Sequence, residues 1–289
     1  MAENRKIIWL ASYPKSGNTW FRVFLTNLLD KNEKPANINN LYPTTIASSR
    51  QMFDEATGLS SSDLSPSEIE TLRPEVYRYI AETSENTIYH KIHDANILTG
   101  TGKELVPPDV TFGALYFIRN PLDVCVSFAH HAATDFQTMS RRMNNPEHSF
   151  CNKPEKLHNQ LEQRLLTWSD HVKSWTDQDK FPVQVVRFED MLENPVETFT
   201  KAVRFAGLKN DKKKIKKALE FSSFEELKKQ ENKSGFLEKA PGASSFFREG
   251  KTGTWKKLLP PKVVKEIVDA NREIMIRYGY LDDQGEICT

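Results

Sequence analysis

The amino-acid sequence predicts an α/β fold with a mostly parallel central sheet flanked by helices. Two observations lead to this prediction: short apolar runs rich in β-branched residues recur along the chain, and longer segments with helical spacing lie between them. Strands that alternate with helices are typical of a parallel sheet covered on both faces, and such sheets bind ligands at the carboxyl ends of their strands. Because α/β enzymes often use this length as a single unit, we expect residues 1–289 to form one domain.

The expected elements can be placed in order along the chain. Strands are predicted at residues 7–11, 87–90, 111–118 and 183–188, where each apolar run is short and bounded by polar or turn residues. Apolar residues at helical spacing predict helices at residues 19–29, 121–131, 156–175, 195–206, 212–220 and 261–278. Ser65 and Glu68 stand in capping-box register and predict the start of one more helix.

Three stretches are expected to be irregular. They span residues 35–63, 142–154 and 232–245, which are polar or contain Gly and Pro. Long loops in a compact enzyme are often lids or substrate walls, so we expect these stretches to build an acceptor pocket. The densest run of basic residues, 209–217, is expected to be a solvated helix face rather than a binding patch.

Charge and composition limit the classes of partner. The chain has 40 Lys and Arg against 39 Asp and Glu, a net charge of +1, so we expect no nucleic-acid partner. No apolar run approaches the roughly 18 residues of a membrane span, and no signal-peptide pattern is present. The three cysteines are widely spaced, which disfavours a disulfide framework or a cysteine zinc site and favours a reducing, cytoplasmic setting. Carboxylates and histidines show no metal spacing, so no metal is expected.

An anion site is predicted directly after the first expected strand, in Ser12-Tyr-Pro-Lys-Ser-Gly-Asn-Thr-Trp20. A helix follows at once, and the free N–H groups at a helix N-terminus carry partial positive charge. Lys15 adds a cation, while Ser16 and Thr19 add hydroxyl donors. In a Walker A loop the lysine follows the second of two glycines, whereas Lys15 precedes Gly17, the one glycine of this loop. The loop is therefore P-loop-like in its physics but not in its pattern.

Three motifs resemble those of the cytosolic-type sulfotransferase family, whose members use 3′-phosphoadenosine 5′-phosphosulfate (PAPS). Residues 13–20, Tyr-Pro-Lys-Ser-Gly-Asn-Thr-Trp, are similar to the family's 5′-phosphosulfate loop. Residues 116–127, Tyr-Phe-Ile-Arg-Asn-Pro-Leu-Asp-Val-Cys-Val-Ser, are similar to its 3′-phosphate segment, and residues 247–256, Phe-Arg-Glu-Gly-Lys-Thr-Gly-Thr-Trp-Lys, resemble its R-K-G-x-x-G-D-W-K signature. The resemblance covers about residues 7–255 and implies a PAPS-dependent enzyme that needs no metal.

The resemblance also implies which residues bind the donor nucleotide. The residues of the 5′-phosphosulfate loop would be Lys15, Ser16, Gly17, Asn18 and Thr19. The 3′-phosphate ligands would be Arg119, Ser127, Arg248 and Gly250, because an arginine fork and hydroxyl groups suit a phosphate dianion. The aromatic residues around the adenine would be Trp20 and Phe224. Phe188, Ser223 and Glu249 fall within matching segments and are counted with the donor-binding positions.

A candidate base lies in Tyr89-His-Lys-Ile-His-Asp94, which resembles the family's K-T-H segment. The resemblance implies His93 as the catalytic base and Lys91 as its companion cation, and strand alternation places both on the side opposite His90. A neutral imidazole can accept a proton near pH 7. The remaining histidines, including the adjacent pair at 130–131, are expected to be surface or packing residues.

The expected reaction is direct, in-line transfer of the sulfuryl group to a hydroxyl or amine of a small-molecule acceptor. His93 would remove the acceptor's proton, and Lys15 would stabilise charge on the leaving nucleotide. Lys91 and the loop amides would support the oxygens of the transferring group. Such a loose transition state depends mainly on positioning and on fixed donors.

Four positions depart from the family pattern. Phe188 replaces the tyrosine of a Y-E-D-M stretch, Glu249 replaces the lysine of R-K-G, Thr254 replaces the aspartate of G-D-W, and Asn18 stands where vertebrate members usually have threonine. Loss of a cation beside the 3′-phosphate predicts weaker donor affinity unless Lys251 or Lys256 compensates. Residues 257–266 match the dimer motif of many animal members only in part, so we expect a monomer or a weak homodimer.

The acceptor and three alternative functions stay open at this point. The protein could sulfate a carbohydrate or glycosylated natural product, use the loop for ATP as a kinase or nucleotidase, or bind a nucleotide without catalysis. The irregular stretches are polar, with Phe136, Phe150, Phe236 and Phe246 in or beside them. This composition favours a small or mixed-polarity acceptor over a protein, and leaves both O- and N-sulfation open.

Overall fold

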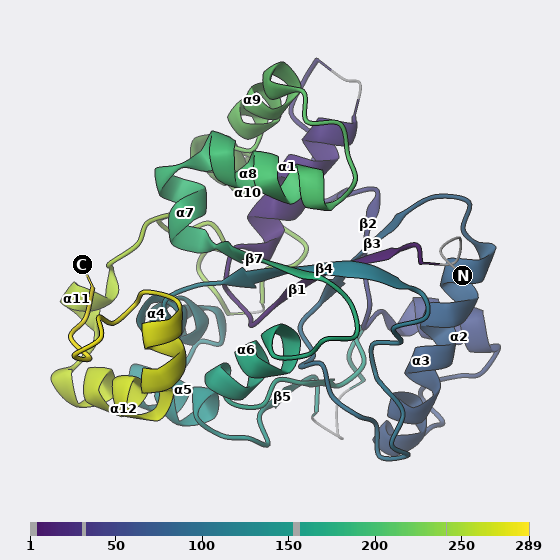
Figure 1. Ribbon diagram of the computed structural model, residues 1–289, viewed down its shortest axis with the longest axis horizontal. Helices are drawn as coiled ribbons and strands as arrows, with labels where there is room; N and C mark the ends of the chain where they lie inside the picture. Colours follow the sequence, from purple (N-terminus) through teal and green to yellow (C-terminus); the bar gives the residue numbers. More distant parts are fainter. Residues whose placement is uncertain (1–4, 31–32, 153–156, 241, 289) are drawn as a thin grey trace.

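A five-stranded parallel sheet forms the centre of the computed structural model (Figure 1). The structure describes residues 5–30, 33–152, 157–240 and 242–288. In spatial order the strands are β2 (Thr44–Ile46), β3 (Ile88–Ile92), β1 (Ile7–Ser12), β4 (Thr111–Ile118) and β7 (Val183–Arg187), and every neighbouring pair is parallel. The predicted α/β fold with a parallel sheet is confirmed.

The sheet is buried on both faces because side chains alternate along its strands. On β1, Ile7, Trp9 and Ala11 belong to one hydrophobic cluster, whereas Ile8 and Leu10 belong to another. The first cluster includes residues of α3 (Pro66–Thr83), α4 (Pro121–His131), α6 (Trp168–Thr176) and α12 (Pro261–Arg277). The second includes residues of α1 (Asn18–Leu29), α8 (Pro195–Phe205) and α9 (Lys212–Phe221), which lie on the opposite side of the sheet in Figure 1.

Shorter elements fill the connections. They are α2 (Arg50–Thr57), α5 (Phe136–Met143), α7 (Phe188–Glu193), α10 (Phe224–Ser234), α11 (Trp255–Leu258) and the antiparallel pair β5 (Ser149–Phe150) and β6 (Gln163–Arg164). Two of the elements, β2 and α2, fall within residues 35–63, which the sequence predicted to be irregular. The predicted capping box is present at the start of α3, where Ser65 and Glu68 exchange hydrogen bonds.

The helix predicted at residues 156–175 is wrong in its first half. Lys156 lies outside the described residues, and the helix α6 begins at Trp168 with Thr167 as its N-cap. Leu161 and Leu165 are spaced like residues on one helix face. They lie in a non-helical segment that contains β6, and their side chains are buried. The four-residue spacing of these two leucines therefore resembles a helix pattern, although the segment is not helical and lies beside a cavity described below.

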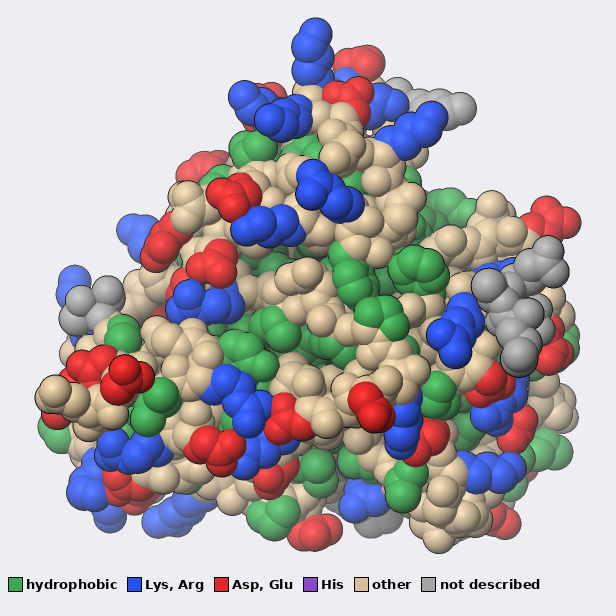
Figure 2. All heavy atoms as spheres, in the orientation of Figure 1, with side chains coloured by type: hydrophobic (Ala, Val, Ile, Leu, Met, Phe, Trp, Pro, Cys, Tyr) green, Lys and Arg blue, Asp and Glu red, His purple; other side chains and the backbone are tan. Residues whose placement is uncertain are grey.

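The basic run at 209–217 lies at the α9 end of the molecule, where Figure 2 shows charged side chains of both signs. Its residues Lys212, Lys213, Lys214 and Lys216 are exposed, and Lys217 forms an ion pair with Glu33. No residue of this run lines the cavity of the described structure. A solvated face is thus the environment observed for these lysines.

The strand order reverses at β1, which lies between β3 and β4. In the register of the sheet, Ala11 is opposite Ile92 and Ser12 is opposite Phe117. The chain segments that leave these three strands therefore start side by side at one edge of the sheet. In open α/β sheets this switch point is where ligands bind.

None of the described helices is long and apolar enough to cross a membrane.

Candidate active site

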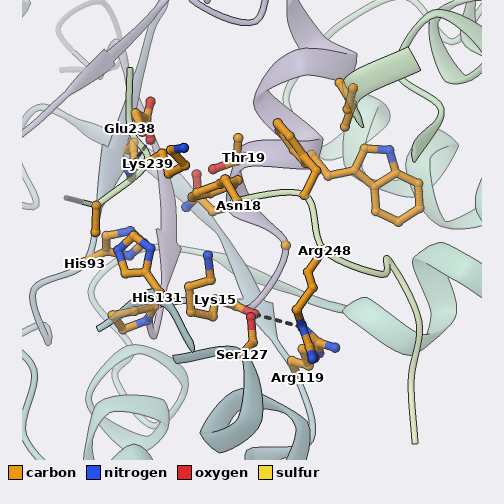
Figure 3. Close-up of a pocket in the computed structure, with 18 of the residues that line it drawn as sticks. Lys15, Asn18, Thr19, His93, Arg119, Ser127, His131, Glu238, Lys239 and Arg248 are labelled. Atoms are coloured by element: carbon orange, nitrogen blue, oxygen red, sulfur yellow. Dashed lines mark hydrogen bonds and ion pairs between the residues drawn. The ribbon is translucent and has the colours of Figure 1, made fainter. Parts of the chain in front are cut away.

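A cavity of about 550 Å³ opens at this edge of the sheet (Figure 3). All of the residues predicted from the sequence line it except Ser16 and Ser223. The predicted residues that line it are Lys15, Gly17, Asn18, Thr19, Trp20, Lys91, His93, Arg119, Ser127, Phe188, Phe224, Arg248, Glu249 and Gly250. These residues come from distant parts of the sequence, and the parallel sheet brings them together.

The loop after β1 is shaped by its backbone and by one amide side chain. Gly17 has a φ of 102°, and a Cβ there would lie 2.8 Å from Cδ2 of Phe188, so only glycine fits without a shift. Asn18 donates from Nδ2 to the carbonyl of Leu10 at 2.7 Å and to Oγ of Ser12 at 3.2 Å. Asn18 therefore ties the start of α1 back to β1, which gives this departure from the family pattern a structural role.

Lys15 presents a half-buried ammonium group at the centre of the loop. Its Nζ lies 3.8 Å from the ring centroid of Phe246, and no carboxylate of the described residues pairs with it. Burial, followed by the charges of Arg119 and Lys91, lowers the pKa of Lys15 to about 7. An anion bound here would stabilise the charged form of this lysine.

Arg119 follows β4 and is buried without a carboxylate partner among the described residues. Its Nη1 and Nη2 donate to the carbonyls of Lys15 at 3.3 Å and Lys251 at 2.9 Å, while its guanidinium lies over the ring of Phe188. Nε has no hydrogen-bond partner in the described structure, and neither has the buried Oγ of Ser16. Burial lowers the pKa of Arg119. Buried donors without partners cost free energy, so this end of the cavity is suited to an anion.

The two sequence departures near this anion site have visible effects. Arg248 lies 3.2 Å from Oε1 of Glu249 and also contacts Nε2 of His130 at 3.2 Å. Part of the positive charge of Arg248 is thus already offset within the protein. Phe188, in place of a tyrosine, packs against Gly17 and under Arg119 rather than offering a hydroxyl group.

The adenine-binding residues implied by the resemblance lie further along the cavity. Gly250 has a φ of 60°, and a Cβ there would overlap Cδ2 of Phe224, so the ring rests directly on the glycine backbone. Trp20 contacts Phe188 edge-on. Ser223 is the N-cap of α10, where its Oγ accepts a hydrogen bond from the backbone N–H of Glu226, and it does not line the cavity.

His93 follows β3 directly and is held by backbone groups. Its Nδ1 lies 2.8 Å from the carbonyl oxygen of Ser12, and because a carbonyl only accepts, Nδ1 carries the proton. The carbonyl of His93 accepts from Nε2 of His171, and Nδ1 of His171 accepts in turn from the hydroxyl of Tyr116. Burial and the charge of Lys91 hold the pKa of His93 well below its usual value. His93 is therefore neutral near pH 7, with the lone pair on Nε2.

Lys91 lines the cavity beside His93, as strand alternation predicted. Its Nζ lies 2.7 Å from Oε2 of Glu238, a residue that the sequence did not single out. His90 points away from the cavity, where its Nδ1 contacts Oγ1 of Thr45. His131, expected to be a surface or packing residue, does pack against Phe246, but it also lines the cavity. Burial, with the charges of two lysines, lowers the pKa of His131 to about 3.

One wall of the cavity is a segment that we call the strap, residues 235–240 and 242–255. It has little regular structure and is fixed mainly by carboxylates. Glu231 accepts the backbone N–H groups of Phe246 at 2.6 Å and Phe247 at 2.9 Å. Asp123, in the first turn of α4, accepts from the backbone N–H groups of Gly253 and Trp255 and from the Thr254 hydroxyl. Thr254 thus joins the strap to α4.

The stretches expected to build an acceptor pocket line the cavity only in part. Phe150 and Cys151, within residues 142–154, and Leu237 to Ala240, within residues 232–245, line the cavity as expected. No residue of 35–63 lines it, and of the four phenylalanines only Phe150 and Phe246 do. Residues 157–160 and Gln163, within the segment predicted to be helical, also line the cavity.

Comparison with known proteins identifies the family. The model of the family described as "Sulfotransferase domain" matches residues 5–279. The chain belongs to the sulfotransferase family. This sulfotransferase is 26% identical over 286 residues to "Cytosolic sulfotransferase 13" of Arabidopsis thaliana, covering 93% of this chain and 76% of the relative. It is 24% identical over 257 residues to human "Sulfotransferase 1C2", covering 86% of this chain and 75% of the relative.

Solved structures show the same fold. A crystal structure of mouse sulfotransferase SULT7A1 complexed with PAP superimposes with a TM-score of 0.60 and 20% identity over 97% of this chain and 86% of that chain. A retinol dehydratase in complex with androsterone and the inactive cofactor PAP gives a TM-score of 0.61 and 18% identity, with 94% and 81% covered. A dehydratase on this fold shows that the reaction must be argued from the site. In the described residues no group of three His, Cys, Asp or Glu is arranged to hold a metal ion.

Proposed function

We propose that this sulfotransferase binds PAPS in the cavity and transfers its sulfuryl group to a hydroxyl or amine of a small-molecule acceptor. One observation carries the proposal: the buried Arg119, whose Nε lacks a partner in the described structure, lines the same cavity as the unpaired ammonium of Lys15 and a neutral His93. The mouse sulfotransferase of the same fold, which was solved in complex with PAP, is consistent with it.

The donor nucleotide would lie along the cavity from Lys15 to Phe224. Lys15, Thr19 and the backbone of Gly17 would hold the phosphosulfate end, with Ser16 contributing its hydroxyl. Arg119, Ser127 and Arg248 would hold the 3′-phosphate, and Trp20 and Phe224 would flank the base. Asn18 holds the shape of the loop, and Ser223 caps α10. Phe188 packs against Gly17, Gly250 packs against Phe224, and Glu249 offsets charge on Arg248.

PAPS supplies a sulfuryl group joined to a phosphate leaving group. Nε2 of His93 accepts the proton of the acceptor's hydroxyl or amine, because Nδ1 is already engaged with Ser12. The ammonium of Lys15 offsets negative charge on the departing phosphate, and Lys91 offsets charge on the transferring oxygens. The protein's part in the chemistry is therefore orientation, one proton acceptor and fixed positive charge.

A carbohydrate or glycosylated natural product is a second candidate acceptor. Asn159, Gln160 and Gln163 line the wall near Phe150, and amide side chains can both donate to and accept from sugar hydroxyls. Leu157 and Leu237, which are exposed at 65% and 83%, also line the cavity and offer apolar surface. This combination supports an acceptor of mixed polarity.

The test is an acceptor screen with labelled PAPS, read by the mass of one added sulfuryl group on the product. Panels of alcohols, phenols, amines and sugars distinguish O- from N-sulfation and the two acceptor classes. Magnesium-dependent turnover of ATP without binding of PAPS would replace the proposal by a kinase. Lys15→Ala and His93→Ala variants that keep full biological effect would replace it by a non-catalytic nucleotide-binding module.

We further propose that residues 1–289 act as one sulfotransferase domain, as a monomer or weak homodimer in the cytoplasm, without a nucleic-acid partner. The three cysteines form no disulfide, which is consistent with a reducing compartment. The near-zero net charge is consistent with the absence of a polyanionic partner. Sedimentation at several protein concentrations tests the oligomeric state.

A further inference from the structure

Glu238 is a carboxylate that enters the cavity from the strap and joins two cations from the body of the molecule. Its Oε1 lies 2.6 Å from Nη1 of Arg22 on α1, and its Oε2 lies 2.7 Å from Nζ of Lys91 on β3. The side chains of Arg22 and Lys91 are only 4% and 9% exposed, and that of Glu238 is 19% exposed. Both oxygens are thus committed to buried cations.

This arrangement fixes the position of the strap. Arg22 is itself held, because its Nε donates to Oγ1 of Thr44 at 3.1 Å. If Glu238 moved away, two buried cations would lose their carboxylate, which is strongly unfavourable. The residues that precede and follow Glu238, Leu237 and Lys239, line the same cavity. The contact therefore determines where this part of the cavity wall lies.

Glu238 also balances charge at the centre of the site. Burial is the main cause of the low pKa of Lys15, the charges of Arg119 and Lys91 lower it further, and Glu238 raises it. The charged or titratable groups that face Lys15 are Arg119 from the end of β4, Lys91 from β3, His131 from α4, Glu231 from α10 and Glu238 from the strap. Glu231 is already engaged by two backbone N–H groups. Of the two carboxylates in this group, Glu238 is the one that pairs with a cation of the group, Lys91.

We propose that Glu238 is a positioning residue of the donor site: it fixes the Lys91 ammonium and the adjoining cavity wall, and its carboxylate offsets the positive charge gathered there. This inference rests on the proposed function, since it assumes that an anionic donor binds at Lys15. It adds to that function a residue outside the three motifs, which acts through Lys91 and Lys15 rather than by touching the donor.

The test measures binding of PAP by isothermal titration calorimetry between pH 6 and pH 8.5. In the wild-type protein, affinity falls as pH rises through the pKa of Lys15, about 7. In Glu238→Gln, loss of the negative charge lowers that pKa, so the fall begins on the order of one pH unit lower. Dissociation of PAP is also faster, because the wall is no longer held.

Glu238→Asp separates charge from geometry. The shorter side chain keeps the negative charge but cannot span both cations at the observed distances. We expect faster PAP dissociation with a pH dependence close to that of the wild-type protein. The matched control is Glu273→Gln, which also removes a carboxylate paired with two cations, Lys173 and Arg277, but lies outside the cavity. It should leave both readouts unchanged.

Two results would overturn the inference while the proposed function stands. PAP affinity that weakens equally at every pH in Glu238→Gln would make the residue merely structural. Affinity that increases equally at every pH would mean that Glu238 only repels the anionic ligand. If Glu238→Gln does not fold, a wild-type dissociation rate in Glu238→Asp also overturns the inference. Wild-type protein that does not bind PAP at all overturns the proposed function, and this inference with it.

Discussion

The floor of the cavity and the strap that covers it are held in different ways. The floor consists of residues that leave β1, β3 and β4, and its position follows from the register of a buried parallel sheet. The strap has almost no regular structure, and Glu231, Glu238 and Asp123 fix it. The comparison teaches that one half of the site depends on distributed backbone pairing, whereas the other half depends on a few carboxylates.

The largest expected effect belongs to the floor. Replacing His93 by alanine should lower kcat/KM by about 10²- to 10⁴-fold, because the acceptor's proton loses its base. PAP affinity should stay close to that of the wild-type protein. Steady-state kinetics on an acceptor found by the screen provides the measurement. His131→Ala is the comparison, and a loss as large as that of His93→Ala would contradict the assignment of the base.

Substitutions of Arg119 and Arg248 compare what the floor and the strap each contribute to PAP affinity. Arg119→Met should raise the Kd of PAP about 10- to 100-fold, since hydrogen bonds to charged groups contribute about 1.5–3 kcal/mol. Arg248→Met should cost less, because Glu249 already offsets part of its charge and its side chain is more exposed. Calorimetry on both variants decides the order. A larger effect for Arg248 would place the main phosphate ligand on the strap.

Stability should reveal the dependence of the strap on single carboxylates. Glu231→Ala leaves the buried N–H of Phe247 and the half-buried N–H of Phe246 without their acceptor, which should lower the free energy of unfolding by about 1–3 kcal/mol. Chemical denaturation measures this loss. Glu225→Ala, on the exposed side of the same helix, should cost less than about 1 kcal/mol. Equal losses would show that Glu231 stabilises only the helix.

The pH dependence of donor binding tests the floor again. A lysine with a lowered pKa is charged below that pKa and neutral above it, so PAP affinity should fall up to about tenfold per pH unit above about pH 7. In Lys15→Arg the guanidinium stays protonated, and the fall should disappear. A pH profile that is the same in both proteins would assign the titration to another group.

The smallest expected effect comes from Glu249, a strap residue that departs from the family pattern. Glu249→Lys restores the family's cation and releases Arg248 from its carboxylate. Because this position is exposed, we expect PAP affinity to rise only about two- to fivefold, with a stronger dependence on salt. Titrations at two ionic strengths test this. A lower affinity would mean that the Arg248–Glu249 pair orients the arginine rather than weakening it.

The same contrast explains what the sequence could predict. The loop at Lys15, the strand end at Arg119 and the base candidate at His93 each belong to a local pattern of strand followed by turn or helix, and all three lie in the cavity. Glu238 was missed because its partner Arg22 is 216 residues away and no local pattern indicates such a pair.

Other errors had a similar physical cause. Residues 157–163 were assigned to a helix because leucines recur at every fourth position, although residues 157–160 and Gln163 line the cavity from a non-helical segment. Residues 35–63 were assigned to the pocket because they are polar, although β2 and α2 form there at the edge of the sheet and beside α3. His131 was dismissed for lack of a motif, and only the packing of α4 against the loop brings it to the cavity. In each case tertiary contacts outweighed local composition.

The bond from His93 to the carbonyl of Ser12 has a consequence for turnover. Many catalytic histidines are oriented by a carboxylate, which would stabilise the imidazolium once it forms. Here the orienting group is uncharged, and Lys91 lies on the same side of the chain. If His93 is the base proposed above, burial and the charge of Lys91 make its protonated ring more acidic than an imidazolium paired with a carboxylate.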